Sequence, residues 1–300
     1  MKSTFFKLIV WGLTPVSVIA SLTAYTYAIM TGNHAEIGIL IVTMLILIIS
    51  IGAERCMPFN AQWNQARQDR STDYTSFAVL AGVVQPMLKW LSPLFVVGVY
   101  AWLDSHSLAL FSDMGLVLQI AIATLLAELG KYAVHRWHHA NPRLWWLHAL
   151  HHSSMRLYSI NGFRTHPLEY AIKHTLSMLP LMLLGMPAEA LLGYIALTQP
   201  VQMLQHVNLP LRHGWLNYIF STNELHRWHH STVAQEANSN YGSAIVLWDI
   251  VFGTYRKAVQ ADGQTAPVSI GLFATTHYPA ARPFFTQVVS MFSPGCCKPA

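Results

Sequence analysis

The sequence that decides the fold is HRWHH at 135–139, with its counterparts HALHH at 148–152 and HRWHH at 226–230. On an α-helix, residues three and four apart share a face, so each cluster presents two or three imidazoles to one side. Imidazoles fixed on a rigid element at this spacing are typical of a metal site. Such ligands suit iron, copper, zinc and nickel but not magnesium or calcium. The three clusters are therefore predicted to bind metal.

The candidate ligands are the histidines that share a face within each cluster, and they are also the candidate catalytic residues: His135, His139, His148, His151, His152, His226, His229 and His230. Eight nitrogens are too many for one first-row ion that keeps an open coordination position, so a pair of metals is expected. Two histidines in short polar segments, His166 and His206, are further candidate metal ligands.

The remaining histidines are expected to serve structural roles, because a lone histidine near a membrane is more often a core or interfacial residue than a ligand. His138 lies off the face shared by His135 and His139. We interpret the others as core, loop or surface residues: His34, His106, His174, His213 and His277.

The composition indicates a membrane protein. Hydrophobic residues make up 53% of the chain and charged residues only 10%, against roughly 25% charged in ordinary soluble domains. The net charge of +5 is modest, and the basic residues gather in a few loops, so no nucleic-acid partner is expected. The cysteines Cys56, Cys296 and Cys297 have neither zinc-site spacing nor the even number of a disulfide framework.

Long apolar runs predict about four transmembrane helices. Residues 5–30 and 37–53 form the first two, and the first is expected to be retained because it is longer than the core of a signal peptide. The third is expected near 91–103, after an interfacial or re-entrant piece that begins at 77, because prolines interrupt this region. The fourth, 114–134, leads directly into the first histidine cluster.

The other segments complete an all-α plan. Residues 171–205 predict a helical hairpin interrupted at Gly185-Met186-Pro187, whereas 54–76 is expected to be a loop. No further span is expected beyond 206. The resulting division is N-terminal transmembrane helices at 1–113, a catalytic region at 114–257 and a C-terminal tail at 258–300.

Basic residues predict the topology. The linkers at 31–36, 104–113 and 184–190 contain no Lys or Arg, and nearly all such residues lie at the N-terminus and in 54–76, 135–170 and 206–257. Because cytoplasmic loops carry an excess of Lys and Arg, the chain is expected to be a multi-pass integral membrane protein with a histidine-rich di-metal cap on the cytoplasmic face.

One acid lies within the fourth predicted span. Glu128 and Tyr132 share a helix face with His135 and His139. Such a carboxylate can orient a ligating imidazole, or it can be an acid at the membrane interface. Both interpretations stay open from the sequence alone.

Several motifs follow one another along the chain, and together they form a highly specific set: HRWHH, HALHHSS, FRTHPLE, QHVNLP, ELHRWHHS and NSNYGSAIVLWDIVFGTY. Over roughly residues 115–257 the chain resembles the membrane-bound fatty acid hydroxylase superfamily, which includes sterol desaturases, fatty acid hydroxylases and alkylglycerol monooxygenase. The resemblance implies an integral-membrane di-iron oxygenase that uses O2 and two external electrons to hydroxylate or desaturate a lipid.

Carried over by position, the superfamily's histidine boxes fall on the eight clustered histidines named above, and its additional histidines match His166 and His206. The last block suggests that four residues help to build the wall of the site or support its ligands: Asn240, Tyr241, Trp248 and Asp249. A turn-stabilising role for these four stays open.

The resemblance also implies cofactors and partners. The expected cofactors are two Fe ions, with O2 as co-substrate, although Zn could occupy the isolated protein. The substrate would be a lipid (sterol, fatty acyl or ether lipid) from the bilayer. No heme module or iron–sulfur cysteine motif is present, so a separate cytochrome b5-like or ferredoxin-like electron donor is expected. Four arginines could attract an acidic donor or hold lipid headgroups: Arg136, Arg143, Arg156 and Arg227.

Two other classes of function compete with the oxygenase. One is a zinc-dependent membrane hydrolase, because zinc has no redox chemistry and would leave hydrolysis as its role. The other is a histidine-based metal carrier, although a carrier should place ionisable groups near the middle of several spans. Here most histidines lie beyond the ends of the spans and repeat at ligand spacing, which favours the oxygenase.

Overall fold

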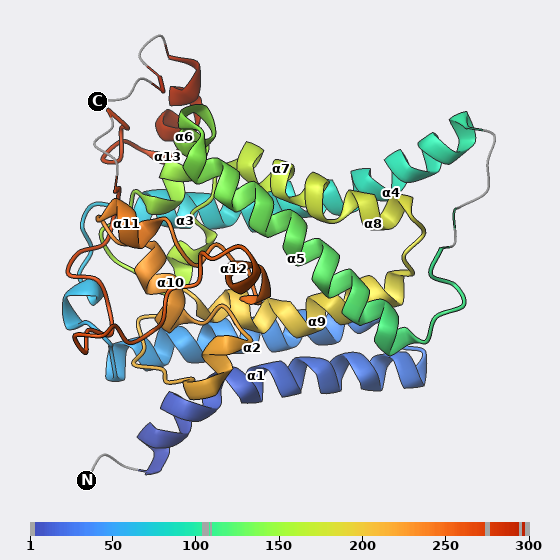
Figure 1. Ribbon diagram of the computed structural model, residues 1–300, viewed down its shortest axis with the longest axis horizontal. Helices are drawn as coiled ribbons and strands as arrows, with labels where there is room; N and C mark the ends of the chain where they lie inside the picture. Colours follow the sequence, from blue (N-terminus) through green and yellow to red (C-terminus); the bar gives the residue numbers. More distant parts are fainter. Residues whose placement is uncertain (1–3, 104–107, 109, 274–276, 294–295, 298–300) are drawn as a thin grey trace.

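A computed structural model describes residues 4–103, 108, 110–273, 277–293 and 296–297, and these residues form helices with no β-strand apart from two isolated bridges (Figure 1). Within the described residues, four helices are long and apolar enough to cross a membrane: α1 (Thr4–Thr31), α2 (Ala35–Cys56), a continuous helix over Arg70–Trp102, and α5 (Leu116–Ala140). The predicted all-α architecture with four spans is confirmed.

The third span differs from its prediction. Instead of a re-entrant piece and a short span, α3 (Arg70–Val79), a π-helical turn (Leu80–Val84) and α4 (Gln85–Trp102) form one unbroken helix. The widened π turn ends two residues before Pro86, which lacks the amide hydrogen that a regular turn needs. The predicted loop 54–76 is correspondingly shorter, because helices occupy both of its ends.

The predicted hairpin is present as α7 (Pro167–Ser177), the short α8 (Leu179–Leu183) and α9 (Ala188–Leu204). As Figure 1 shows, α5 crosses the molecule between α7 on one side and α9 on the other, and α9 packs in turn on α1 and α2. The absence of a side chain at Gly130 allows α5 to pack closely on α7. A Cβ atom there would lie 2.7 Å from the carbonyl oxygen of Leu176.

The short elements of the cap gather at one end of this bundle, and two of them, α6 (Pro142–His152) and α10 (Asn223–His229), carry histidines. The cap also comprises α11 (Ala234–Ala237), α12 (Leu247–Val251), α13 (Phe284–Val289) and the 3-10 turns Ala61–Asn64, Ser159–Phe163, Gly214–Tyr218 and Ser290–Phe292. These elements are short, so long-range contacts fix their positions.

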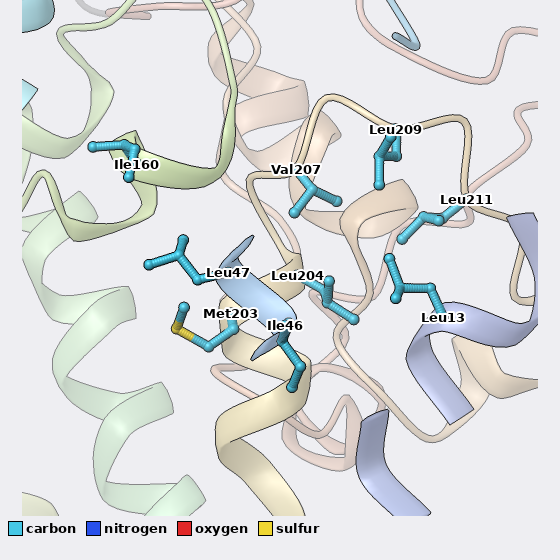
Figure 2. Close-up of a cluster of buried hydrophobic side chains, with 9 residues drawn as sticks. All are labelled: Leu13, Ile46, Leu47, Ile160, Met203, Leu204, Val207, Leu209 and Leu211. Carbon is cyan, nitrogen blue, oxygen red and sulfur yellow. The ribbon is translucent and has the colours of Figure 1, made fainter. Parts of the chain in front are cut away.

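An apolar cluster holds the chain that follows α9 (Figure 2). Its nine buried side chains come from α1, α2, α9 and two loops: Leu13, Ile46, Leu47, Ile160, Met203, Leu204, Val207, Leu209 and Leu211. Burying one such side chain is worth roughly 1.5–3 kcal/mol. Because His206 lies between Leu204 and Val207, this packing fixes the backbone of one candidate ligand.

Buried acids from the first half of the chain hold the loops of the cap. Glu54 accepts hydrogen bonds from the backbone amides of Ser159 and Asn208, both at 2.8 Å. Arg156 donates two hydrogen bonds to Asp69, from Nε at 2.6 Å and from Nη2 at 2.9 Å. Buried charges of this kind are stable only when they are paired and hydrogen-bonded.

The expectation that four arginines form a basic docking surface is wrong for two of them. Arg156 is buried against Asp69, and Arg227 is buried with its guanidinium over the ring of Phe59. Neither arginine can meet an acidic partner or a lipid headgroup. Arg136 and Arg143 are exposed.

We predict that Gly130→Ala destabilises the protein. The new methyl group would meet the backbone of Leu176 and Ser177, and overpacking of this kind typically costs about 1–3 kcal/mol. Thermal unfolding in detergent should show a midpoint several degrees lower. The control is Gly98→Ala in α4, where a Cβ atom meets nothing within 4 Å. Equal midpoints for the two variants would contradict the close packing of α5 on α7.

Candidate metal centre

Eight histidines converge in two groups at the cap end of the bundle. The first group is His135, His139, His148 and His229, and the second is His151, His206, His226 and His230. Within each group, one nitrogen of every ring lies within 4.8 Å of the corresponding nitrogens of the others. Such a set of donors can surround one metal ion, so the structure offers two adjacent candidate sites.

A ninth histidine, His152, lies against both groups. Its Nε2 is 3.2 Å from Nε2 of His148 and 3.1 Å from Nε2 of His229, and its ring centroid is 4.5 Å from that of His230. Seven of the nine rings are buried, and His139 and His151 are partly buried.

The helices place these rings as the sequence spacing predicts. The end of α5 carries His135 and His139, and α6 carries His148, His151 and His152. Asn141 alone joins the two helices, and its side chain caps α6 by accepting hydrogen bonds from the amides of Arg143 and Leu144.

Six of the nine rings are held by hydrogen bonds at Nδ1. The acceptors are the carbonyl oxygens of Tyr241 (for His135, 2.8 Å), Ser239 (for His229, 3.0 Å) and Arg164 (for His151, 3.1 Å), and the side-chain oxygens of Glu169 (for His148, 2.7 Å), Asn161 (for His206, 2.9 Å) and Asn238 (for His139, 3.1 Å). Because a neutral imidazole carries a single N–H, donation from Nδ1 leaves a lone pair on Nε2. In these six rings that lone pair is available to a metal.

The Nε2 atoms approach one another too closely to be left without a cation. They lie 2.9 Å apart between His135 and His148 and 3.0 Å apart between His206 and His226. In the first pair both Nδ1 atoms already donate, so the two Nε2 atoms are acceptors and repel. Two imidazoles bound to one ion at about 2.1 Å and at right angles would have nitrogens about 3 Å apart. The observed spacing fits shared ions.

Burial keeps the imidazoles neutral. Loss of solvation lowers the pKa of His229 to about 4 and that of His206 to about 3. Burial also lowers the pKa of His148, His226 and His230 well below the usual value. Neutral imidazole is the form that binds metal, so the protonation state suits the proposed ligands.

His166, a candidate ligand from the sequence, does not join either group. Its Nδ1 accepts a hydrogen bond from the amide of Leu168, and its Nε2 donates to the carbonyl oxygen of Val288. The ring therefore caps the N-terminus of α7 and has no free nitrogen. His206, the other additional candidate, belongs to the second group.

The histidines that were expected to be structural lie outside the two groups. His138 bonds the carbonyl oxygen of Val134, four residues earlier in its own helix. His174 and His213 bond Ser92 and Glu224, respectively. His34 and His277 are exposed, and His106 lies outside the described residues.

Glu128 orients no histidine, although it lies on the same helix as His135. Its Oε2 accepts hydrogen bonds from the amides of Ala244 and Ile245, and its Oε1 accepts from the hydroxyl of Tyr194 at 2.9 Å. The carboxylate therefore ties α5 to α9 and to the loop that follows the last histidine cluster.

The carboxylate that does orient a ligand is Glu169, whose role the sequence analysis missed. Glu169 Oε1 lies 2.7 Å from both His148 Nδ1 and Lys173 Nζ. Burial alone would raise the pKa of Glu169, but the positive charge of Lys173 lowers it, so the carboxylate stays ionised. A signal existed in the sequence, because an acid four residues before a lysine in a helix that begins at Pro167 predicts such a pair.

Two of the four predicted wall residues support the site directly. Asp249 accepts hydrogen bonds from the amides of Tyr241, at 2.8 Å, and Gly242, at 2.7 Å. These bonds fix the Tyr241 carbonyl that receives His135. The other two hold neighbouring segments of the backbone. Asn240 donates hydrogen bonds to the carbonyl oxygens of Leu225 and Arg256, and Trp248 donates one to the carbonyl oxygen of Leu125.

The sequence is similar to those of known proteins. The fatty acid hydroxylase family model matches residues 120–254. An ornithine lipid hydroxylase, OlsE of Rhizobium tropici, is 33% identical over 90% of this chain and 83% of its own length. Alkylglycerol monooxygenase of Danio rerio is 29% identical over 52% of this chain and 34% of its own, and sphinganine C4-monooxygenase 2 of Arabidopsis thaliana is 26% identical over 56% and 67%. No solved structure gives a significant match.

We predict that Glu169→Gln weakens metal binding, because the amide replaces the charged acceptor of His148 and leaves Lys173 unneutralised. Loss of a group that orients a ligand typically costs 10–100-fold in metal affinity. Competition with a chelator, followed by metal analysis, measures the change. Glu189→Gln, at an exposed acid at the start of α9, is the control. An unchanged affinity in Glu169→Gln would remove this residue from the centre.

Proposed function

Because the chain belongs to the fatty acid hydroxylase family, we propose that it is a membrane-bound di-iron oxygenase that hydroxylates or desaturates a lipid. Relatives named for lipid hydroxylation and monooxygenation, together with four membrane-capable helices, indicate an integral membrane oxidoreductase of lipid oxygenation. The observation that supports the di-iron proposal is the convergence of eight imidazoles in two groups of four, with a ninth, His152, against both groups and with Nε2 atoms facing one another.

The set of donors favours iron for this chemistry. Both groups consist of imidazoles alone, which suits iron as well as zinc. Iron held there would supply the activation of dioxygen that side chains cannot perform. Zinc can bind the same nitrogens, including in isolated protein, but it has no redox chemistry.

The proposed reaction balances with an external source of electrons. For hydroxylation, a C–H bond of the lipid, O2, two electrons and two protons give a C–OH group and one water. For desaturation, two C–H bonds break, the same oxidant and electrons are used, and the products are an alkene and two waters. Two electrons must therefore arrive from a separate donor protein in each turnover. The exposed Arg136 and Arg143 are candidate contacts for it.

The chain's own residues hold the ligands and exclude water. Backbone carbonyls and Glu169 fix the orientation of the imidazoles, as described above. The rings of Trp145 and Phe273 lie against His139, with centroids 5.2 and 5.3 Å from that ring, and cover one side of the first group. An apolar cover of this kind keeps water from the reacting carbon.

The names of the relatives reduce the range of lipid classes that we propose as substrates. They refer to ornithine lipid, alkylglycerol and sphinganine, each of which carries a long apolar chain on a polar head. We therefore favour a chain-bearing polar lipid of the bilayer over a sterol. The division into helices at 1–113, a catalytic region at 114–257 and a tail at 258–300 stays a proposal, as does the cytoplasmic position of the site.

The test of function combines metal analysis of purified protein with lipid mass spectrometry of cells that express it. We predict two irons per chain and a lipid that gains one oxygen or loses two hydrogens. His229→Ala should lose metal and abolish turnover, whereas the exposed His34→Ala should do neither. Zinc together with a hydrolysed ester would instead support the hydrolase, and full activity in His229→Ala would contradict the assignment of the site.

Cysteine labelling tests the topology. In a background without native cysteines, Asp262→Cys reports on the histidine side and His34→Cys on the turn between α1 and α2; both positions are exposed. Since the basic residues gather on the histidine side, an impermeant reagent added outside should label position 34 and leave position 262 unlabelled. The reverse pattern would invert the proposed topology.

A further inference from the structure

A polar pocket of about 650 Å³ lies beside the histidine centre. We call it the Arg256 pocket; its lining includes Asn238, Ser239, Thr254, Arg256, Lys257 and Gln260. Its volume is in the range of small-molecule sites. The metal chemistry proposed above makes no use of it.

The pocket shares its wall with the metal centre. Asn238 bonds His139 Nδ1 through its side chain, and Ser239 bonds His229 Nδ1 through its carbonyl oxygen. Thr254 is hydrogen-bonded at 3.0 Å to Tyr132, one turn before His135 on α5. A molecule bound in the pocket is therefore separated from the first histidine group by a single layer of residues.

Directly before the pocket, the chain exposes an apolar belt. Leu247, Ile250, Val251 and Phe252 are all exposed, and the next residue, Gly253, lines the pocket. Trp248 of the same segment donates a hydrogen bond to the carbonyl oxygen of Leu125, which lies ten residues before His135 in the fourth span. The belt therefore lies against the fourth membrane-capable helix, which would place it at the depth of the bilayer and the pocket near the polar boundary.

The pocket carries positive charge that the described residues do not neutralise. Arg256 pairs with Glu236 at 3.1 Å and lies over the ring of Trp228, so its charge is already balanced. Lys257 is exposed, and its ammonium group has no ion pair among the residues that the structure describes. The unpaired ammonium of Lys257 favours an oxyanion such as phosphate or carboxylate.

We propose that the Arg256 pocket binds the anionic headgroup of a membrane lipid whose chains lie along the apolar belt. This inference rests on the proposed function: the pocket selects anionic lipids as the class of substrate that reaches the histidine centre. The continuity of belt and pocket points to a lipid headgroup, whereas a free phosphate would use the pocket alone.

The test measures lipid binding without turnover, so its outcome is independent of the proposed oxygenation. Purified full-length protein in a neutral detergent is titrated with dioleoylphosphatidylglycerol or dioleoylphosphatidylcholine, and bound lipid is counted by native mass spectrometry. We expect tighter binding of phosphatidylglycerol. Lys257→Gln should weaken it about five-fold, the usual effect of one basic residue near an anionic lipid. Lys257→Arg should retain it, and phosphatidylcholine should bind all of these proteins alike.

The control is Arg282→Gln, which removes one charge at an exposed position outside the pocket lining. Equal weakening in this variant would show a general effect of charge and overturn the site. Equal binding of the two lipids by the unchanged protein would also overturn it. A third arm adds inorganic phosphate, and complete displacement of phosphatidylglycerol at sub-millimolar phosphate would assign the pocket to a free anion instead of a lipid.

Discussion

The rest of the structure depends on the mutual repulsion of imidazole lone pairs. Eight of the nine rings have an Nε2 atom about 3 Å from the Nε2 atom of another ring, and in the first group the Nδ1 atoms of His135, His148 and His229 already donate to fixed acceptors. Such an arrangement is unfavourable unless cations lie between the nitrogens. The surrounding structure therefore does two things at once: it orients each ring and it resists the repulsion.

The long helices alone could not hold the histidine rings together against the repulsion between their nitrogens. The cap consists of short helices and turns, held by the buried carboxylates of Glu54, Asp69 and Asp73 from the N-terminal half and by the apolar cluster that includes Leu204 and Val207. The helices that precede the matched region are thus part of the support for the site. These acids can be buried because Asp69 and Asp73 are paired with arginines and Glu54 accepts hydrogen bonds from Ser159 and Asn208.

Much of this was predictable from the sequence, for physical reasons. Imidazoles three and four residues apart must share a helix face, so the members of each cluster could be assigned before the structure was known. The unbroken helix of the third span could not be predicted, because a π turn before Pro86 removes the break that proline normally causes. His166 and Glu128 have the right chemistry and position in sequence, but partners distant in the chain (Val288 for the first and Ala244 for the second) decide their roles.

The central claim is that the two histidine groups each hold one metal ion. Anomalous diffraction from crystals of protein purified with iron, recorded on either side of the iron absorption edge, tests it most directly. The account predicts two iron peaks, one among His135, His139, His148 and His229 and the other among His151, His206, His226 and His230. A single peak, or rings bridged by water with no anomalous signal between them, would contradict it.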